Sequence, residues 1–257
     1  MIPEKVQIFL NRKVEEYNQH SFIQSDPICV PHRYTKKQDI EIAAFFSAIF
    51  AWGKRPIIIS KATSLMDLMD HAPHDFCLHA GANELKRLLT FKHRTFNATD
   101  LLYFVEFLRY HYSNNNSLET AFSQWMQPED IDTARALSGF YRYCFSLEDV
   151  PQRSKKHIST PDRKSTCKRL NMFLRWMVRK DNRGVDFGLW ENISPRQLIC
   201  PIDVHVARVA RHFRLIHREQ TDWTTALELT ACLKELCPED PVKYDFALFG
   251  LGITENF

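Results

Sequence analysis

The sequence predicts a protein that is mostly or wholly α-helical. Glycine is scarce, at 7 of 257 residues, and no stretch shows the valine- and isoleucine-rich alternation that is typical of strands. Long segments instead repeat apolar residues at the 3.6-residue period of a helix that is packed on one side. The sequence has no internal repeat and no low-complexity tract. We therefore expect an all-α fold whose helices pack around a common core.

Apolar periodicity and helix caps give the elements of the first half in order. A helix is expected at 3–19, and 21–37, which holds two prolines, should form an irregular link. The helix at 39–53 is apolar on nearly every face and should be buried. Asp100 and Ser117 are expected to be N-caps. The remaining elements of this half are helices at 56–70, 83–90, 100–112, 117–126 and 133–145, and a polar turn at 91–97.

The second half begins with a basic, proline-marked segment, 150–166, which predicts a mobile loop. Lys168 then stands at the start of a helix that ends near residue 181. An apolar stripe buries one face of this helix, and Lys168, Arg175 and Arg179 are expected on a different, basic face. Residues 181–199 should form an irregular connection anchored by Trp190.

The next helix is expected at 201–215. Pro201 suits a first helical turn, and Asp203 places an acid at the positive end of the helix dipole. Arg208, Arg211 and Arg214 should face outward. Two further helices are expected, at 223–237 with Thr221 or Asp222 as its cap, and at 242–253.

Size and composition limit the class of protein. The chain is long enough to bury a core as a single globular unit, 1–257. It contains no apolar run of the ~18 residues that a membrane span needs, and its start lacks the apolar region of a signal peptide. We expect a cytoplasmic protein without membrane contact. Seven cysteines include no Cys-x-x-Cys pair, so we expect no metal and no cofactor.

Charge is distributed unevenly along the chain. Between residues 151 and 218 there are 16 Lys and Arg against 5 Asp and Glu, a net charge of +11. Because the whole chain carries +3, the rest carries −8. A basic segment on an otherwise acidic protein indicates a polyanionic partner. A solvated surface with distributed ion pairs is the alternative explanation.

Several stretches, in order, resemble the helix-hairpin-helix DNA glycosylase superfamily of endonuclease III and the 8-oxoguanine glycosylases. DIEIAAFFSAIFAWGKRPIIISKA is similar to the early buried helix of that superfamily, and CKRLNMFL to the helix that begins with its catalytic lysine. PIDVHVARVARHFRL is similar to the Val-Asp-Thr-His-Val segment that carries its catalytic aspartate. CPEDPVKYDFALFGLGI is similar to its closing helix. The chain also resembles a bacterial family described only as a domain of unknown function.

The sequence departs from the superfamily at the hairpin. The usual pattern is Leu-Pro-Gly-x-Gly-x-Lys, whose glycines let backbone amides approach a DNA phosphate. This chain has PDRKSTCK, without glycine. The spacing of 35 between Lys168 and Asp203 is also longer than usual, which makes 181–199 an insertion.

The resemblance implies a fold, a partner and a reaction. It implies two helical lobes with a substrate cleft between them, at about 38–166 and at about 1–37 together with 167–257. The implied partner of the monomer is double-stranded DNA with a flipped damaged nucleotide. The implied activity is that of a DNA N-glycosylase with lyase activity, with an oxidised purine as one candidate lesion.

The resemblance also implies roles for individual residues. Lys168 would attack the sugar as a neutral amine and form a Schiff base, with Lys164 as the alternative nucleophile. Asp203 would stabilise the developing sugar cation. The residues expected to contact the flipped nucleotide are Arg94, Trp52, His93, His205 and Tyr244. The residues expected to bind DNA phosphates are Lys164, Ser165, Thr166, Arg169, Arg175, Arg179, Arg208 and Arg211.

Simpler explanations exist for the same residues. A lysine at a helix start often only faces solvent, and an aspartate there is often only a cap. A non-catalytic nucleic-acid-binding protein would keep the basic surface without needing Lys168 and Asp203 together. A structural protein would show no affinity for DNA at moderate salt.

Overall fold

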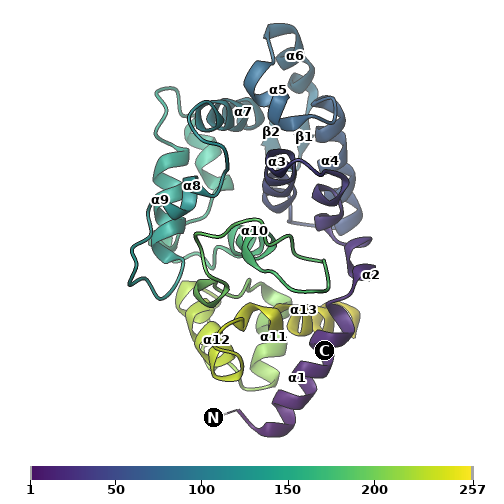
Figure 1. The fold of residues 1–257 in the computed structure, drawn as a ribbon, viewed down its shortest axis with the longest axis vertical. Coiled ribbons are helices and arrows are strands. Elements are labelled where there is room, and N and C mark those ends of the chain that lie inside the picture. Colours follow the sequence, from purple (N-terminus) through teal and green to yellow (C-terminus); the bar gives the residue numbers. More distant parts are fainter. Residues whose placement is uncertain (1, 256–257) are drawn as a thin grey trace. The chain divides into compact units, whose positions relative to one another are not determined.

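The computed structural model describes residues 2–255, which are mostly helical (Figure 1). The prediction of a predominantly α-helical protein is confirmed. The α-helices are α1 (Glu4–Tyr17), α2 (His20–Ile23), α3 (Lys37–Ile49), α4 (Arg55–Leu68), α5 (Pro73–His79), α6 (Ala82–Arg87), α7 (Ala98–Tyr112), α8 (Thr120–Ser123), α9 (Ala134–Cys144), α10 (Lys168–Val178), α11 (Val204–His212), α12 (Trp223–Leu236) and α13 (Tyr244–Thr254). Two short strands, β1 (Lys92–His93) and β2 (Phe96–Asn97), pair antiparallel.

The chain is divided into two compact units. Unit 1 comprises Met1–Gln24, Met126–Ser138 and Ser159–Phe257, and unit 2 comprises Ser25–Trp125 and Gly139–Ile158. Helix α9 contributes residues to both units. The predicted lobes, about 38–166 and about 1–37 with 167–257, stay a prediction, because compactness alone does not establish two lobes around a cleft.

Unit 2 is built around α3, which is buried over nearly its whole length, as its apolar sequence predicts. Phenylalanine rings surround it, because burying large aromatic surface is strongly favourable. Glu41 of α3 is also fully buried, and it accepts hydrogen bonds from the Tyr112 hydroxyl (2.8 Å), the Ser117 hydroxyl (2.5 Å) and the Leu118 amide (3.0 Å). These donors compensate the cost of burying a carboxylate. The largest fully buried side chains of unit 2 are Phe45, Phe46, Phe50, Phe96, Phe104, Phe107, Phe122 and Phe140.

Local signals placed two caps of unit 2 incorrectly. The N-cap of α7 is Asn97, and Asp100 instead accepts from the Asn97 amide as the other half of a capping box. Ser117 is not the N-cap of α8 either, because this helix starts only at Thr120, after Glu119. The Ser117 hydroxyl accepts from the Glu119 amide (3.2 Å) and donates to Glu41. The turn predicted at 91–97 contains the β1–β2 hairpin, with Arg94 in the left-handed region at φ 54°.

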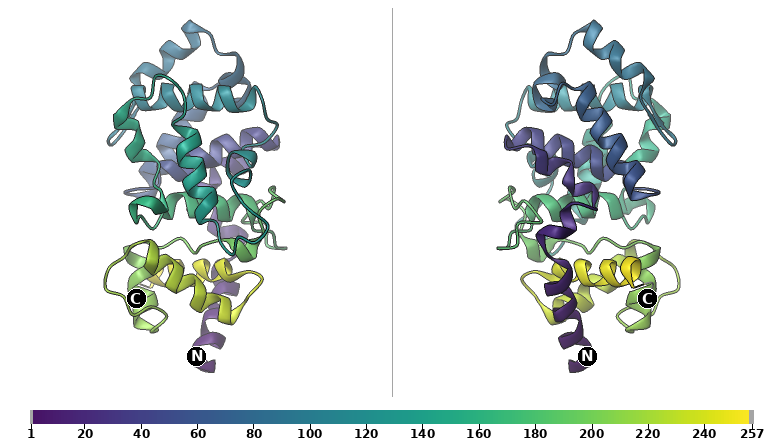
Figure 2. Two further views of the ribbon diagram at one scale, coloured as in Figure 1. Left: turned by 90° about the vertical axis from the view of Figure 1, so that its left-hand side faces the viewer. Right: turned by 90° about the vertical axis from the view of Figure 1, so that its right-hand side faces the viewer.

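Unit 1 is organised around α13, which packs against both α1 and α11 (Figures 1 and 2). Two glycines of α13 make these close contacts possible. A Cβ atom at Gly250 would overlap the ring of Tyr17 on α1, and one at Gly252 would crowd the backbone of His205 on α11. The last apolar helix is therefore the element that joins the first helix to the Asp203 segment.

The chain after α10 folds back onto that helix. The amides of Phe187 and Leu189 donate to the carbonyls of Trp176 (2.8 Å) and Met177 (2.7 Å). Trp190 is buried and its ring meets Phe173 edge-on, so its predicted anchoring role is confirmed. None of the helices described between residues 2 and 255 combines the length and the hydrophobicity that crossing a bilayer requires.

Candidate functional site

Lys168 is the first residue of α10, and the turn before it contains two left-handed residues. Lys164 has φ 58° and Cys167 has φ 51°, a region that costs non-glycine residues roughly 1–2 kcal/mol each. Hydrogen bonds hold the turn, since the Lys164 amide donates to the Pro161 carbonyl (2.7 Å) and the Trp223 amide donates to the Lys164 carbonyl (3.0 Å). The start of α10, whose first amides have no intrahelical partner, is thus fixed in unit 1.

Cys167 is a possible competing nucleophile beside Lys168, but its environment prevents this. Burial raises the pKa of the Cys167 thiol to about 12. The thiol stays protonated at neutral pH, and a protonated thiol is a poor nucleophile. Its amide donates to the Ser165 hydroxyl (3.2 Å), which contributes to the turn. Lys168 is therefore the reactive candidate of the two.

Asp203 is the N-cap of α11. One carboxylate oxygen, Oδ1, accepts from the amides of His205 (2.9 Å) and Val206 (3.0 Å). The helix proper begins at Val204, so Pro201 precedes the first turn and does not form part of it. Because capping uses Oδ1, the second oxygen, Oδ2, is available for another partner.

That partner is Lys168. The Lys168 Nζ atom lies 3.7 Å from Asp203 Oδ2, and the two side chains are 22% and 25% exposed. The same Nζ atom lies 5.9 Å from the ring centroid of Phe249 on α13. Two segments that are 35 residues apart in the sequence thus place an amine and a carboxylate together in unit 1. A partly exposed ion pair of this kind adds only ~0–1 kcal/mol of stability. Stabilisation of the fold therefore does not by itself explain why the two side chains are paired.

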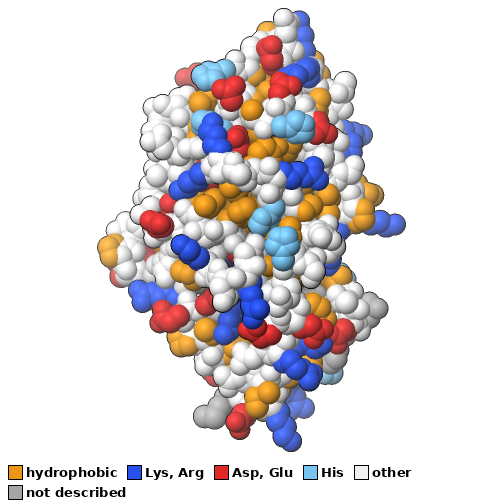
Figure 3. Space-filling model, turned by 45° about the vertical axis from the view of Figure 1, so that its right-hand side comes forward, with side chains coloured by type: hydrophobic (Ala, Val, Ile, Leu, Met, Phe, Trp, Pro, Cys, Tyr) orange, Lys and Arg blue, Asp and Glu red, His pale blue; other side chains and the backbone are white. Residues whose placement is uncertain are grey.

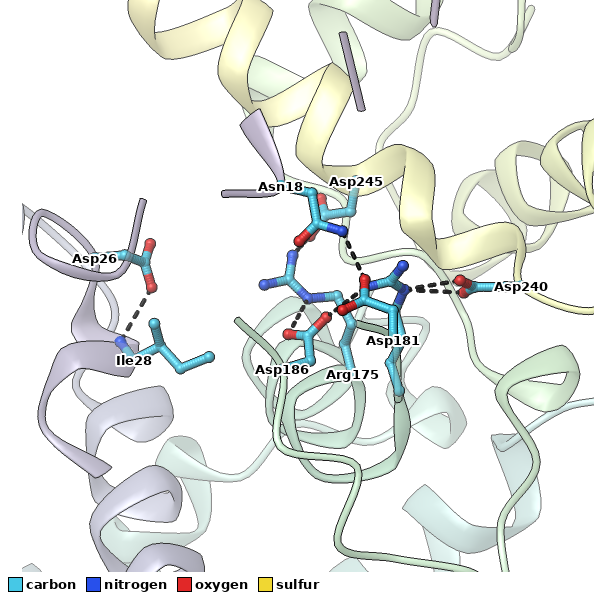
Figure 4. A network of polar contacts seen from close by, with 9 residues as sticks. Asn18, Asp26, Ile28, Arg175, Asp181, Asp186, Asp240 and Asp245 are labelled. Carbon is cyan, nitrogen blue, oxygen red and sulfur yellow. Dashed lines mark hydrogen bonds and ion pairs between the residues drawn. The ribbon is translucent and has the colours of Figure 1, made fainter. Parts of the chain in front are cut away.

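A buried network of ion pairs lies further along α10, around Arg175 and Arg179 (Figure 4). The Arg175 guanidinium donates to Asp186 through Nε (3.2 Å) and to Asp245 through Nη1. It also stacks on Phe246, 4.4 Å from the ring centroid. Arg179 donates to Asp181, Asp186 and Asp240. Removing one partner from such a buried network costs far more than removing a surface charge.

Asp245 is the unusual member of the network. Burial raises its pKa from 3.8 to about 6, against the lowering effect of the Arg175 and Lys168 charges, and the Asp203 carboxylate raises it further. The Asp245 carboxyl therefore interacts electrostatically with both members of the Lys168–Asp203 pair. It titrates close to neutral pH, as groups at functional sites often do.

The sequence matches the family described as Protein of unknown function (DUF2400) over residues 26–254. The chain belongs to this family. Comparisons with curated proteins and with solved structures give no match. The matched region includes Lys168, Asp203 and Asp245.

Two of the expected phosphate-binding residues of this family member are placed differently from the prediction. Arg175 and Arg179 are each only 3% exposed, and carboxylates surround both guanidinium groups. The prediction that they form a basic outer face is wrong. The helical period showed only that the two arginines point to a different side of α10 from the apolar stripe. The segment after α10 folds back over that side, and its aspartates pair with both arginines.

The other predicted phosphate ligands lie nearer the surface. Lys164 and Arg208 are exposed, whereas Ser165, Thr166 and Arg169 are half-buried. The Arg211 guanidinium donates to the carbonyls of Arg218 (2.9 Å) and Glu219 (2.6 Å) and so fixes the chain after α11. On the face that Figure 3 draws, Lys and Arg side chains are interspersed with Asp and Glu rather than gathered into one continuous area.

Three of the expected nucleotide contacts, Trp52, His93 and Arg94, belong to unit 2. His93 is buried, its Nε2 atom lies 3.1 Å from the Phe50 carbonyl, and its ring lies 4.8 Å from that of Trp52. Arg94 is exposed at the tip of the hairpin, with its guanidinium against Gly53. The structure thus groups these three residues within unit 2, and their contact with a nucleotide stays a prediction.

The remaining two expected contacts, Tyr244 and His205, lie in unit 1. Tyr244 is fully buried and its hydroxyl donates to Asn11 Oδ1 (2.8 Å), so its ring has no free face for a base, and the prediction is wrong on this point. His205 is half-buried beside Gly252, and its Nδ1 atom has no hydrogen-bond partner within the described chain.

Sequence reasoning missed Asp245. The sequence does place Asp245 and Phe249 four residues apart on one face of the closing helix, but only the fold shows that this face meets Lys168. In residues 2–255, no three His, Cys, Asp or Glu side chains form a group that could hold a metal ion.

Proposed function

We propose that this chain is a DNA glycosylase with lyase activity that acts on a damaged nucleotide, with oxidised purines as first candidates. The observation that carries the proposal is the Lys168–Asp203 pair. The two residues come from separate segments that resemble the lysine and aspartate segments of helix-hairpin-helix glycosylases, and their charged groups lie 3.7 Å apart at the starts of α10 and α11. A merely coincidental resemblance would not require the two to meet.

The backbone before α10 also supports the proposal. With Lys168 on the lysine of the pattern Leu-Pro-Gly-x-Gly-x-Lys, the first glycine falls on Lys164. Lys164 adopts the left-handed conformation that glycine favours, φ 58° and ψ 19°. The turn therefore has a glycine-like conformation without glycine, which is consistent with a hairpin that presents backbone amides to a phosphate.

The chemistry follows from the two groups. The neutral Lys168 amine attacks C1′ of the flipped nucleotide, and the base leaves with the electron pair of the glycosidic bond. After the sugar ring opens, the product is a Schiff base, and loss of the 3′ phosphate by β-elimination nicks the strand. Asp203 Oδ2 is the nearest acidic group to the amine, so it is placed to accept a proton and to stabilise positive charge on the sugar.

Borohydride trapping tests this function directly. Wild-type protein and Lys168→Gln are incubated with duplex DNA that carries an abasic site or 8-oxoguanine, and covalent adducts are counted on a denaturing gel. We expect an adduct with wild type and none with Lys168→Gln. Lys164→Gly is the matched control, because it removes a nearby amine while suiting the left-handed backbone. An adduct that survives Lys168→Gln but is lost in Lys164→Gly would move the nucleophile to Lys164.

A non-catalytic nucleic-acid-binding protein is the second candidate. The observation that favours it is that both residues already have a structural role: Asp203 caps α11, and Lys168 forms an ion pair with Asp203. Salt-dependent DNA binding without any adduct, unchanged in Lys168→Gln, would support it against the glycosylase.

A further inference from the structure

Unit 1 contains a pocket of about 560 Å³ at the end of α10 that is opposite to Lys168. It is lined by one side of α1, by residues 179–183 after α10, and by Lys243 just before α13. Its volume is in the range of pockets that hold small molecules. Lys168 is the first residue of α10 and Arg179 follows the last one, so these two residues are about 16 Å apart along the helix. The pocket is therefore separate from the Lys168–Asp203 pair.

The acids that line this pocket already have donors, and their contacts fix its floor. Asp181 Oδ2 accepts hydrogen bonds from Asn18 Nδ2 and Arg179 Nη1, both at 2.7 Å (Figure 4). Asp181 Oδ1 accepts from the backbone amide of Arg183 (2.8 Å), and Glu15 of α1 forms an ion pair with the Arg183 guanidinium. Because Asn18 and Arg179 are each only 3% exposed, the floor is held in place without a ligand.

Two cations at the pocket differ from these acids, because they lack a hydrogen-bonding partner. Within residues 2–255, neither the Arg12 guanidinium nor the Lys243 ammonium forms a hydrogen bond or an ion pair with a carboxylate. Arg12 lies 5.4 Å from the ring centroid of Phe9, and Lys243 lies 5.1 Å from that of Tyr244. The unused hydrogen-bonding capacity of the pocket thus includes two cationic donor groups, which have no acceptor atoms of their own.

We propose that this pocket binds a small phosphate ester, with Arg12 and Lys243 as the groups that hold the phosphate. The two cations come from separate elements, so one anion has to offer oxygens to both. A phosphomonoester has more oxygens and more negative charge than a carboxylate, which suits two cations better. The Asn11 side chain adds a neutral donor, Nδ2, and is tethered through its Oδ1 atom by the Tyr244 hydroxyl (2.8 Å). This binding does not depend on the proposed glycosylase activity.

The test is calorimetric titration of the whole chain at constant ionic strength with three related probes. Glucose 6-phosphate carries the phosphate, glucuronate carries a carboxylate at the same carbon, and glucose carries neither. We expect saturable one-to-one binding of glucose 6-phosphate, weaker binding of glucuronate, and no binding of glucose. No saturation by glucose 6-phosphate up to ~10 mM, which covers Kd values to about 1 mM, would overturn the proposal. Tighter binding of glucuronate would overturn it as well.

Three variants locate the binding. Arg12→Gln and Lys243→Gln should each weaken the binding of glucose 6-phosphate about tenfold or more, the scale of one charge-assisted hydrogen bond. Lys5→Gln is the matched control, because Lys5 is an exposed cation of the same helix α1 that does not line the pocket, and it should bind as wild type does. Arg12 is exposed, so Arg12→Gln should fold and can decide the question even if Lys243→Gln does not.

Two patterns among the variants would contradict the proposal. An equal loss of binding in Lys5→Gln would show only a general attraction of anions to a basic surface. Binding that is unchanged in Arg12→Gln and Lys243→Gln would place the phosphate at another part of the protein.

Discussion

Replacing Asp245 by asparagine should remove one pH-dependent part of the stability of the protein. Folding raises the pKa of this carboxyl from 3.8 to about 6, and burial is the largest cause. The folded state thus holds the proton more tightly than the unfolded chain. The stability that this group contributes is fully present below about pH 3.8 and is lost as pH rises to about 6.

The size of the effect follows from the gap between the two pKa values. At about 1.4 kcal/mol for each tenfold change in proton affinity, the gap corresponds to roughly 3 kcal/mol of unfolding free energy. The free energy of unfolding of wild type minus that of Asp245→Asn should therefore fall by roughly 2 kcal/mol between pH 4 and 7, most of it before pH 6, and then stay level. The subtraction cancels the titration of the groups that do not interact with Asp245.

Urea unfolding at pH 4, 5, 6 and 7 measures this difference. Tryptophan fluorescence is a suitable signal, because Trp176 and Trp190 are buried in the folded protein. Asp75→Asn, at an exposed carboxyl, controls for the general effect of removing a negative charge. A difference that rises with pH would refute the reasoning, since it would mean that the attraction of Arg175 outweighs the cost of burial.

Three further predictions concern single contacts. Asp203→Ala should lower the free energy of unfolding by about 1 kcal/mol through loss of the α11 cap. Asp203→Ser should keep most of that stability but trap borohydride adducts roughly 10²–10³-fold less than wild type. If Asp203→Ser lost as much stability and as much trapping as Asp203→Ala, that would argue against a chemical role for the carboxylate. Gly250→Ala should destabilise the protein by ~1–3 kcal/mol in thermal unfolding, because the new Cβ overlaps the ring of Tyr17. An unchanged melting temperature would show that α1 can shift away from α13 at little cost. Glu41→Ala should cost about 2–5 kcal/mol, because it leaves the Tyr112 hydroxyl and other buried donors unpaired, and an effect below 1 kcal/mol would show that water or rearrangement satisfies them.

Much of the helical architecture could be predicted from local sequence. Segments such as 39–53 and 223–237 carry enough apolar periodicity to indicate helices. Of the two caps expected for α12, Thr221 or Asp222, the structure shows Asp222, which accepts from the Thr225 amide (3.0 Å). Local rules failed where an element is short. Helix α5 was not predicted, although Pro73 suits its first turn, because seven residues carry too little periodicity.

The sequence by itself determined that this protein is helical, and it pointed to Lys168 and Asp203, because propensity, capping and motif resemblance all act within a few residues. Only the tertiary structure decided which charges meet. The direction of Arg175 and Arg179 away from the apolar stripe was readable, but their burial depends on the acids of the segment that folds back over α10. The burial of Asp245 depends on the packing of α13 in unit 1, a long-range arrangement that no local pattern encodes. Burial then raised the pKa of Asp245, because the cost of an ionised carboxylate is set by the environment that the fold builds around it.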